Sequence, residues 1–163
     1  DALRLDNNKT IITRIDGGQD RHDSVAAGLG HLHSNSNFVA VHDGARPLIT
    51  SQQISKVLEI AIEHDAATSA RPVTETIKRV STDGFANEAL CRDNLWLMET
   101  PQIFKANLLK KAYDIVHKNG ERVTDEVSAM ELIHHKTRVV ANDRPNPKIT
   151  YPEDIPLAEK MIF

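Results

Sequence analysis

An acidic and a basic side chain follow directly on a predicted strand. The apolar run Phe38–Val41 leads into a segment that contains Asp43, Ala45 and Arg46. In open α/β sheets, ligands bind beyond the carboxyl ends of the strands. A carboxylate there can bind a hard cation such as magnesium, an arginine can bind phosphate oxygens, and small residues let a ligand approach the backbone. The segment predicts a phosphate and metal site, although Asp43 and Arg46 would equally suit a structural ion pair.

Two adjacent glycines precede a predicted helix. Gly17 and Gly18 stand shortly before Asp23 and Ser24, either of which is the expected N-cap. Glycines permit the close approach of a ligand, and a helix N-terminus offers N–H groups to an anion or to the edge of a base. A tight turn between strand and helix explains the same glycines, and the residues alone favour that explanation.

A segment near the end of the chain also suits both a ligand-binding role and a structural role. Lys148 and Thr150 precede a predicted last helix, and alternation along a strand would put both on one face. A lysine and a hydroxyl at a helix start suit a phosphate. Thr150 would also serve as an N-cap, with Glu153 completing a capping box. The two roles are compatible.

The elements that must position these residues alternate between strand and helix. The predicted strands are Thr10–Ile15, Phe38–His42, Ala66–Ala70 and Thr137–Ala141. One predicted helix runs from Asp23 or Ser24 to about Leu32, a second follows a Thr50/Gln53 capping box, and a third covers Leu108–Val116 and ends at Gly120. Two more helices are predicted to begin at Thr124 and near Pro152. Strands separated by crossover helices predict one α/β domain over residues 1–163 with a mainly parallel, doubly wound sheet.

Residues 72–94 break this alternation. Val73–Val80 alternates in polarity, Ser81–Gly84 has the composition of a turn, and Ala89–Arg92 can return as a second strand. A two-stranded arm has little core of its own and needs a surface to pack on. A second subunit would provide that surface, and an ordinary surface hairpin is the open alternative. Trp96, just after the arm, is read as an aromatic anchor in the core.

The composition excludes several classes of function. The chain has 163 residues, 40% of them hydrophobic, and a net charge of −3 without a basic block, which argues against nucleic-acid binding. No apolar run approaches the roughly 18 residues of a membrane span, and the first residues do not resemble a signal peptide, so no membrane partner is expected. Cys91 is the only cysteine, which favours a reducing compartment, and the eight histidines show no convincing metal-binding spacing.

Short motifs occur in a defined order along the chain, and together they resemble one enzyme family. The motifs are Asp16–Val25, Val41–Pro47, Thr74–Lys78, Thr100–Phe104, Thr124–Ala129 and Lys148–Asp154. They resemble the 2-C-methyl-D-erythritol 4-phosphate cytidylyltransferases of non-mevalonate isoprenoid biosynthesis. The resemblance runs from about Thr10 to the end. It implies a three-layer Rossmann-like nucleotidyltransferase fold with a mainly parallel sheet and a protruding β-hairpin arm.

The resemblance also implies a reaction. The enzyme would transfer a cytidylyl group from CTP to 2-C-methyl-D-erythritol 4-phosphate, giving 4-diphosphocytidyl-2-C-methyl-D-erythritol and pyrophosphate. Magnesium would offset charge on the triphosphate, and no covalent enzyme intermediate would form. Such transfer depends mainly on alignment and on charge stabilisation. Two alternatives stay open: a cytidylyltransferase for ribitol 5-phosphate or another polyol phosphate, and a non-catalytic dimeric Rossmann-like module.

Roles for individual residues follow from the resemblance. Gly18 and Ser24 would contact the cytidine end of CTP, and Asp43 would lie at the phosphates and the metal, beside Ala45. The residues implied to hold methylerythritol phosphate are Arg46, Thr76, Arg92, Thr100 and Lys148. Arg92 and Lys148 would position its phosphate and, with Asp43, form the catalytic set. The arm, residues 72–94, would cross to a neighbouring subunit, so that Thr76 and Arg92 complete the site of the partner in a homodimer.

The chain also departs from the family pattern. Gln19 stands where an acid is common, Gly44 where alanine is usual, and Pro147 where a β-branched residue is usual. Nothing before Asp16 matches the glycine-rich CTP loop with which the family opens. We therefore expect the domain to be N-terminally incomplete and this chain to bind CTP poorly. The expected compartment is the bacterial cytoplasm or the plastid stroma.

Overall fold

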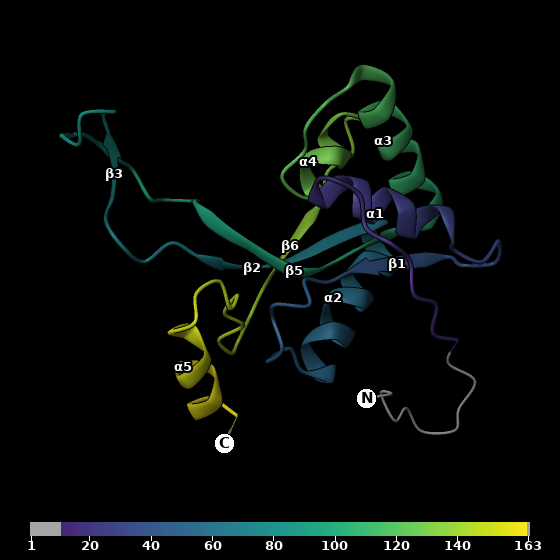
Figure 1. Ribbon diagram of the computed structural model, residues 1–163, viewed down its shortest axis with the longest axis horizontal. Coiled ribbons are helices and arrows are strands. Elements are labelled where there is room, and N and C mark those ends of the chain that lie inside the picture. Colours follow the sequence, from purple (N-terminus) through teal and green to yellow (C-terminus); the bar gives the residue numbers. More distant parts are fainter. Residues whose placement is uncertain (1–10, 163) are drawn as a thin grey trace.

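A central sheet lies between two layers of helices in the computed structural model, which describes residues 11–162 (Figure 1). In this part of the chain the main sheet has four strands, in the order β1 (Phe38–Val41), β5 (Trp96–Lys105), β2 (Ala66–Pro72) and β6 (Arg138–Ala141). The helices are α1 (Arg21–Gly30), α2 (Ser51–His64), α3 (Ala106–Asn119), α4 (Glu126–Glu131) and α5 (Asp154–Lys160). The strands β3 (Ile77–Val80) and β4 (Ala86–Leu90) form a separate pair. None of the helices in residues 11–162 has both the length and the apolar character that a membrane span requires.

The strand directions agree with the predicted mainly parallel sheet. β2 pairs with β6 in parallel, and β5 pairs antiparallel with both β1 and β2. Within the described part of the chain, three of the four strands in the main sheet therefore point the same way. β5 is the exception, and it was not predicted. The predicted α/β class with a Rossmann-like arrangement and a protruding hairpin is confirmed.

The composition of β5 explains why it was missed. The strand contains Glu99, Pro101 and Gln102, whereas a buried strand is expected to be apolar and free of proline. The β2–β5 ladder shifts register between Thr68 and Ala70, so Pro101 lies where that pairing is interrupted. A proline lacks an N–H and is tolerated at such an irregularity. Trp96, at the start of β5, is 37% exposed, so its reading as a core anchor is wrong.

Each face of the sheet carries its own hydrophobic core. Neighbouring residues on a strand point to opposite faces, and Phe104 and Ile103 do so here. Phe104 packs in a cluster with residues of α1, α3 and α4, whereas Ile103 packs with Val57 and Ala61 of α2. The two clusters make the three layers of the predicted fold.

The helix ends show which local predictions were correct. Thr50 and Gln53 form the predicted capping box before α2, and Gly120 ends α3 in a left-handed conformation with φ of 64°. α1 begins earlier than predicted, because Asp20 is its N-cap and the Asp23 carboxylate accepts a hydrogen bond from the Asp20 N–H at 3.0 Å.

Two further local predictions are wrong. Residues 11–15 form no strand, although their β-branched composition favours one; Thr10, the start of that prediction, lies outside the described residues. Thr150 does not cap α5 through its side chain. Instead, the Asp154 carboxylate accepts hydrogen bonds from the N–H groups of Thr150 and Tyr151 at 2.8 and 2.9 Å. Those bonds lower the pKa of Asp154.

The predicted hairpin is present and projects from the body of the domain (Figure 1). β3 and β4 pair with each other in an antiparallel ladder, with a shift in register between Lys78 and Val80. Val80 and Phe85 are exposed at 56% and 69%. The arm therefore presents apolar surface and has no core of its own in this chain.

A buried acid joins the three helices above the sheet. Glu126, at the start of α4, is fully buried and accepts hydrogen bonds from both terminal nitrogens of the Arg21 guanidinium at 2.7 and 3.0 Å. The Tyr113 hydroxyl of α3 donates to the same carboxylate at 3.1 Å. Burial, together with the negative charge of Glu126, raises the pKa of Tyr113. Glu126 therefore links α1, α3 and α4 through one carboxylate.

Replacing Glu126 by glutamine tests this link. The variant removes the charge that Arg21 pairs with, so the free energy of unfolding should fall by about 3 kcal/mol in urea denaturation, as for other broken buried pairs. Glu131→Gln, an exposed change on the same helix, is the control and should alter it by less than about 0.5 kcal/mol. Equal effects of the two changes would contradict a structural role for Glu126.

Candidate active site

Asp43 is the centre of a cluster of charged side chains at the end of β1. Among the described residues, three cationic groups approach its carboxylate: the guanidinium of Arg21 at 3.4 Å, that of Arg46 at 3.4 Å and the ammonium of Lys148 at 3.3 Å. The Asp43 side chain is only 13% exposed, whereas that of Lys148 is 46% exposed. The predicted meeting of Asp43, Arg46 and Lys148 is therefore present in the fold.

The cations keep Asp43 ionised. Burial by itself would favour the neutral acid, but the positive charges of Lys148, Arg21 and Arg46 outweigh it, and the pKa of Asp43 lies below its ordinary value. The hydrogen bond to Glu126 and the nearby carboxylates outweigh the burial of Arg21, so its pKa is raised. Both groups thus carry their full charge near neutral pH.

The loop that carries Asp43 is held by β5 and by the C-terminal segment. The Asp43 N–H donates to the Thr100 hydroxyl at 3.0 Å, and the Arg46 N–H closes a turn on the Asp43 carbonyl at 2.9 Å. The Ala45 carbonyl accepts a hydrogen bond from the Ile149 N–H at 2.8 Å. That last bond brings the segment containing Lys148 against the loop, although residues 147–150 are not the strand that the sequence suggested.

Arg46 has a second, structural attachment. One terminal nitrogen of its guanidinium donates to the main-chain carbonyl of Asn146 at 2.7 Å. The buried side-chain amide of Asn146 donates in turn to the Thr100 carbonyl at 2.7 Å. Arg46, Asn146 and Thr100 therefore form one connected frame around the Asp43 loop.

Gly18 lies in the loop that leads into α1, and Ser24 lies near the start of that helix. The Gly18 N–H donates to the Ser24 hydroxyl at 3.0 Å. A Cβ atom at Gly18 would lie 2.1 Å from the Cβ of Asp23, so the turn itself requires glycine there. The tight turn between loop and helix thus accounts for Gly18 without a ligand. The nucleotide contact expected for both residues stays a prediction.

Thr76 directly precedes β3 and Arg92 lies two residues after β4, the two strands of the arm that projects from the body of the domain (Figure 1). Arg92 donates to the carbonyl of Thr74 within the arm, and Thr76 is exposed. The fold of one chain therefore does not bring these two residues to the site that contains Asp43. This placement agrees with the expectation that they serve another subunit, which the structure of one chain does not test.

Sequence reasoning missed the roles of Arg21 and Glu126. Both residues stand in motifs that carry the family resemblance, Asp16–Val25 and Thr124–Ala129, but their contact joins positions 105 residues apart. Spacing along the chain could not pair them. The available hint was the charged residue Glu126 near the start of a predicted helix. We interpreted that segment only as the beginning of a helix.

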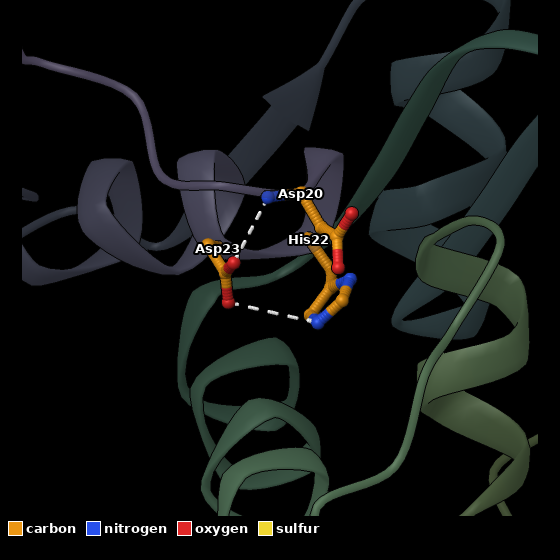
Figure 2. A group of neighbouring side chains, drawn as sticks. All are labelled: Asp20, His22 and Asp23. Carbon is orange, nitrogen blue, oxygen red and sulfur yellow. Dashed lines mark hydrogen bonds and ion pairs between the residues drawn. The ribbon is translucent and has the colours of Figure 1, made fainter.

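A group of three potential metal ligands lies at the start of α1 (Figure 2). Ligand atoms of Asp20, His22 and Asp23 all lie within 4.8 Å of one another. Asp23 accepts the Asp20 N–H and lies 3.6 Å from the His22 ring, and Asp20 pairs with Arg122 at 3.3 Å. The capping of the helix start and these contacts account for the arrangement.

Comparisons with known proteins fit this geometry. A profile of the family described as IspD, 2-C-methyl-D-erythritol 4-phosphate cytidylyltransferase, matches residues 2–163. The chain is 41% identical over 145 residues to the chloroplastic protein of that name from Oryza sativa subsp. japonica, covering 89% of this chain and 49% of the relative. It is 39% identical over 154 residues to the protein of that name from Pelotomaculum thermopropionicum, covering 94% and 65%.

A solved structure agrees with the same relationship. The crystal structure of 2-C-methyl-D-erythritol 4-phosphate cytidylyltransferase from Francisella tularensis is similar with a TM-score of 0.84 and 32% identity, covering 98% of this chain and 75% of that one. The chain spans about half to two thirds of the length of the two sequence relatives. The profile match and these identities show that the chain belongs to the 2-C-methyl-D-erythritol 4-phosphate cytidylyltransferase family.

Proposed function

We propose that the protein transfers a cytidylyl group from CTP to 2-C-methyl-D-erythritol 4-phosphate, releasing pyrophosphate, in isoprenoid biosynthesis. The observation that carries the proposal is the meeting of Arg21, Arg46 and Lys148 around Asp43 in a member of this family. The compartment would be the bacterial cytoplasm or the plastid stroma, because the relatives include bacterial proteins and one named chloroplastic.

The charge balance of the site suits phosphorylated substrates. Arg21, Arg46 and Lys148 are positive, and Asp43 and Glu126 are negative, so these groups together leave a surplus of one positive charge. Lys148 is nearly half exposed, and within residues 11–162 its ammonium pairs with the Asp43 carboxylate, which has other partners. Its ammonium can move to a phosphate oxygen without leaving Asp43 unpaired. An anionic substrate would thus gain charge-assisted hydrogen bonds at small cost to the protein.

The reaction needs alignment more than covalent chemistry. A phosphate oxygen of methylerythritol phosphate attacks the α-phosphorus of CTP, and the bond to pyrophosphate breaks as the new bond forms. Arg46 and Thr100 would contact methylerythritol phosphate, and Lys148 and Arg92 of a neighbouring subunit would hold its attacking phosphate. Their fixed positive charges would stabilise negative charge that develops on the transferring group, and no group of the enzyme becomes bonded to the nucleotide.

Asp43 fits a role in holding magnesium. Magnesium in nucleotide enzymes is usually bound through one or two carboxylates together with substrate phosphates and water. Asp43 is ionised and its side chain keeps 13% exposure just after β1, whereas Glu126 is fully buried and committed to Arg21 and Tyr113. When bound, the metal would offset the charge of the triphosphate. Gly18, Ser24 and Ala45 would contact the nucleotide beside it.

The arm would complete the site of a second subunit. The arm, which contains Thr76 and Arg92, projects from the body of the domain and exposes Val80 and Phe85. Apolar surface on a two-stranded arm favours packing against another copy. A homodimer in which each arm crosses to its neighbour would bring Arg92 to the phosphate of the polyol substrate.

The direct test measures pyrophosphate release from CTP with purified protein of full natural length. Turnover should be faster with 2-C-methyl-D-erythritol 4-phosphate than with ribitol 5-phosphate, in a magnesium-dependent reaction. Faster turnover with ribitol 5-phosphate would overturn the proposed substrate. Absence of release with either compound would overturn the proposed transferase activity.

Co-expression of two inactive variants tests the crossing of the arm. Asp43→Ala and Arg92→Ala should each be nearly inactive. In a mixed dimer, Asp43 of one chain and Arg92 of the other would rebuild one intact site, so random pairing should restore about a quarter of the wild-type sites. A mixture that is no more active than the single variants would show that Asp43 and Arg92 do not share a site across subunits.

The pH dependence of stability tests the charge on Asp43. Its lowered pKa means that it stabilises the fold above the pKa of the unfolded chain, about 4, and that this contribution is lost as pH falls through the lower folded value. Asp43→Asn should therefore reduce the free energy of unfolding at pH 7, and the difference from wild type should shrink near pH 3. Asp114→Asn, an exposed change on α3, should have little effect at either pH. A difference for Asp43→Asn that stays constant with pH would contradict the account.

A further inference from the structure

His42 bridges both sides of the loop that carries Asp43. Its Nε2 atom lies 3.0 Å from the main-chain carbonyl oxygen of Arg46, and its Nδ1 atom lies 2.9 Å from the Thr100 hydroxyl. The same hydroxyl accepts the Asp43 N–H at 3.0 Å. His42 therefore touches the frame of the proposed site at two points, yet it belongs to none of the roles assigned above.

The partners of His42 define its tautomer. A carbonyl oxygen only accepts, so Nε2 must carry the proton that bonds to Arg46. In the neutral ring, Nδ1 is then an acceptor, and the Thr100 hydroxyl must donate to it. The result is a directed chain: the Asp43 N–H donates to Thr100, Thr100 to His42, and His42 to the Arg46 carbonyl.

We propose that His42, in the neutral form protonated on Nε2, is a positioning residue that closes the Asp43–Arg46 loop and makes Thr100 a hydrogen-bond acceptor for a substrate hydroxyl. This inference rests on the proposed function, because it assigns a task to Thr100 at the polyol end of that site. The inference adds His42 to the site and fixes which group donates in the hydrogen bond between Thr100 and His42.

The direction matters because a hydroxyl has one hydrogen and two lone pairs. Among the described residues, the hydrogen of Thr100 is committed to His42 and one lone pair to the Asp43 N–H. Thr100 is 3% exposed, so a substrate hydroxyl would take the second lone pair as part of a closed contact. A polyol hydroxyl can donate to that lone pair, whereas an ionised phosphate oxygen has no hydrogen to give. Thr100 thus selects the polyol part of the substrate and leaves its phosphate to cationic side chains such as Lys148.

The tautomer can be measured without any assay of catalysis. Long-range proton–nitrogen NMR of protein with 15N-labelled histidine, assigned with a His42→Gln variant, should place the proton of His42 on Nε2 and show Nδ1 as a hydrogen-bonded acceptor. In Thr100→Val, Nδ1 should shift towards the resonance of an acceptor without a partner while the proton stays on Nε2. A proton on Nδ1 in the wild-type protein would overturn the inference.

Substitutions then separate the two contacts of His42. His42→Ala should raise the KM for the polyol phosphate about five- to tenfold, the scale of a lost neutral hydrogen bond, and change the KM for CTP less than about twofold. His42→Asn puts an amide oxygen near the place of Nδ1 and should recover most of this loss, whereas His42→Gln should not. His31→Ala is the matched control, because its ring also bonds a carbonyl four residues away, at 2.8 Å from Ala27, and it should leave both KM values unchanged.

The outcomes distinguish this inference from the proposed function. Equal rises in both KM values for His42→Ala, or no recovery in His42→Asn, would show that His42 only helps to pack the loop. Either result would overturn the inference, while the proposed transferase activity would still stand. If wild-type protein of full natural length released no pyrophosphate, the proposed function would fail, and the polyol role of Thr100 with it. The NMR result would still decide the tautomer.

Discussion

The charge on Asp43 is the constraint on which the site depends. Its carboxylate draws together Arg21 from α1, Arg46 from its own loop and Lys148 from the C-terminal segment. Without it, these cations would stand close to one another with no negative charge between them, and repulsion would separate the segments that carry them. The same convergence gives a substrate phosphate several charged partners at once. The stability of the loop and the binding of anions therefore depend on one group.

Buried polar side chains hold that cluster in place. Glu126 fixes Arg21, and Gln102 of β5 accepts the N–H of Glu126 at 3.1 Å while its amide donates to Asp125 at 3.0 Å. Thr100, two residues earlier, supports the Asp43 loop. A buried polar group destabilises a fold unless it is hydrogen-bonded, and these groups have partners. β5 is thus polar where it faces the site and apolar at Ile103 and Phe104, where it supports the two cores.

The sequence was most informative where chemistry and local structure coincide. Asp43 and Arg46 follow an apolar strand, and in a sheet of this class ligands bind beyond the carboxyl ends of the strands, so the position of these two residues could be predicted. The place of Lys148 beside them was implied by the family resemblance, because residues 147–150 are not a strand. The Thr50 cap and the Gly120 stop are local and were also predicted. The strand β5 could not be predicted, because its proline and polar residues are accommodated only by partners that are distant in the sequence. The pairing of Arg21 with Glu126 was missed for the same reason. The roles of Thr76 and Arg92 need a second chain, and they stay predictions.

The central claim is that Asp43 and the cations around it form the phosphate and metal site. It is tested most directly by a crystal structure of the protein in its full natural length with magnesium, a non-hydrolysable CTP analogue and 2-C-methyl-D-erythritol 4-phosphate. The account predicts magnesium on the Asp43 carboxylate and the Lys148 ammonium turned from Asp43 to a phosphate oxygen. Phosphates bound on another face, with the contacts of Asp43 to Arg21, Arg46 and Lys148 unchanged, would contradict it.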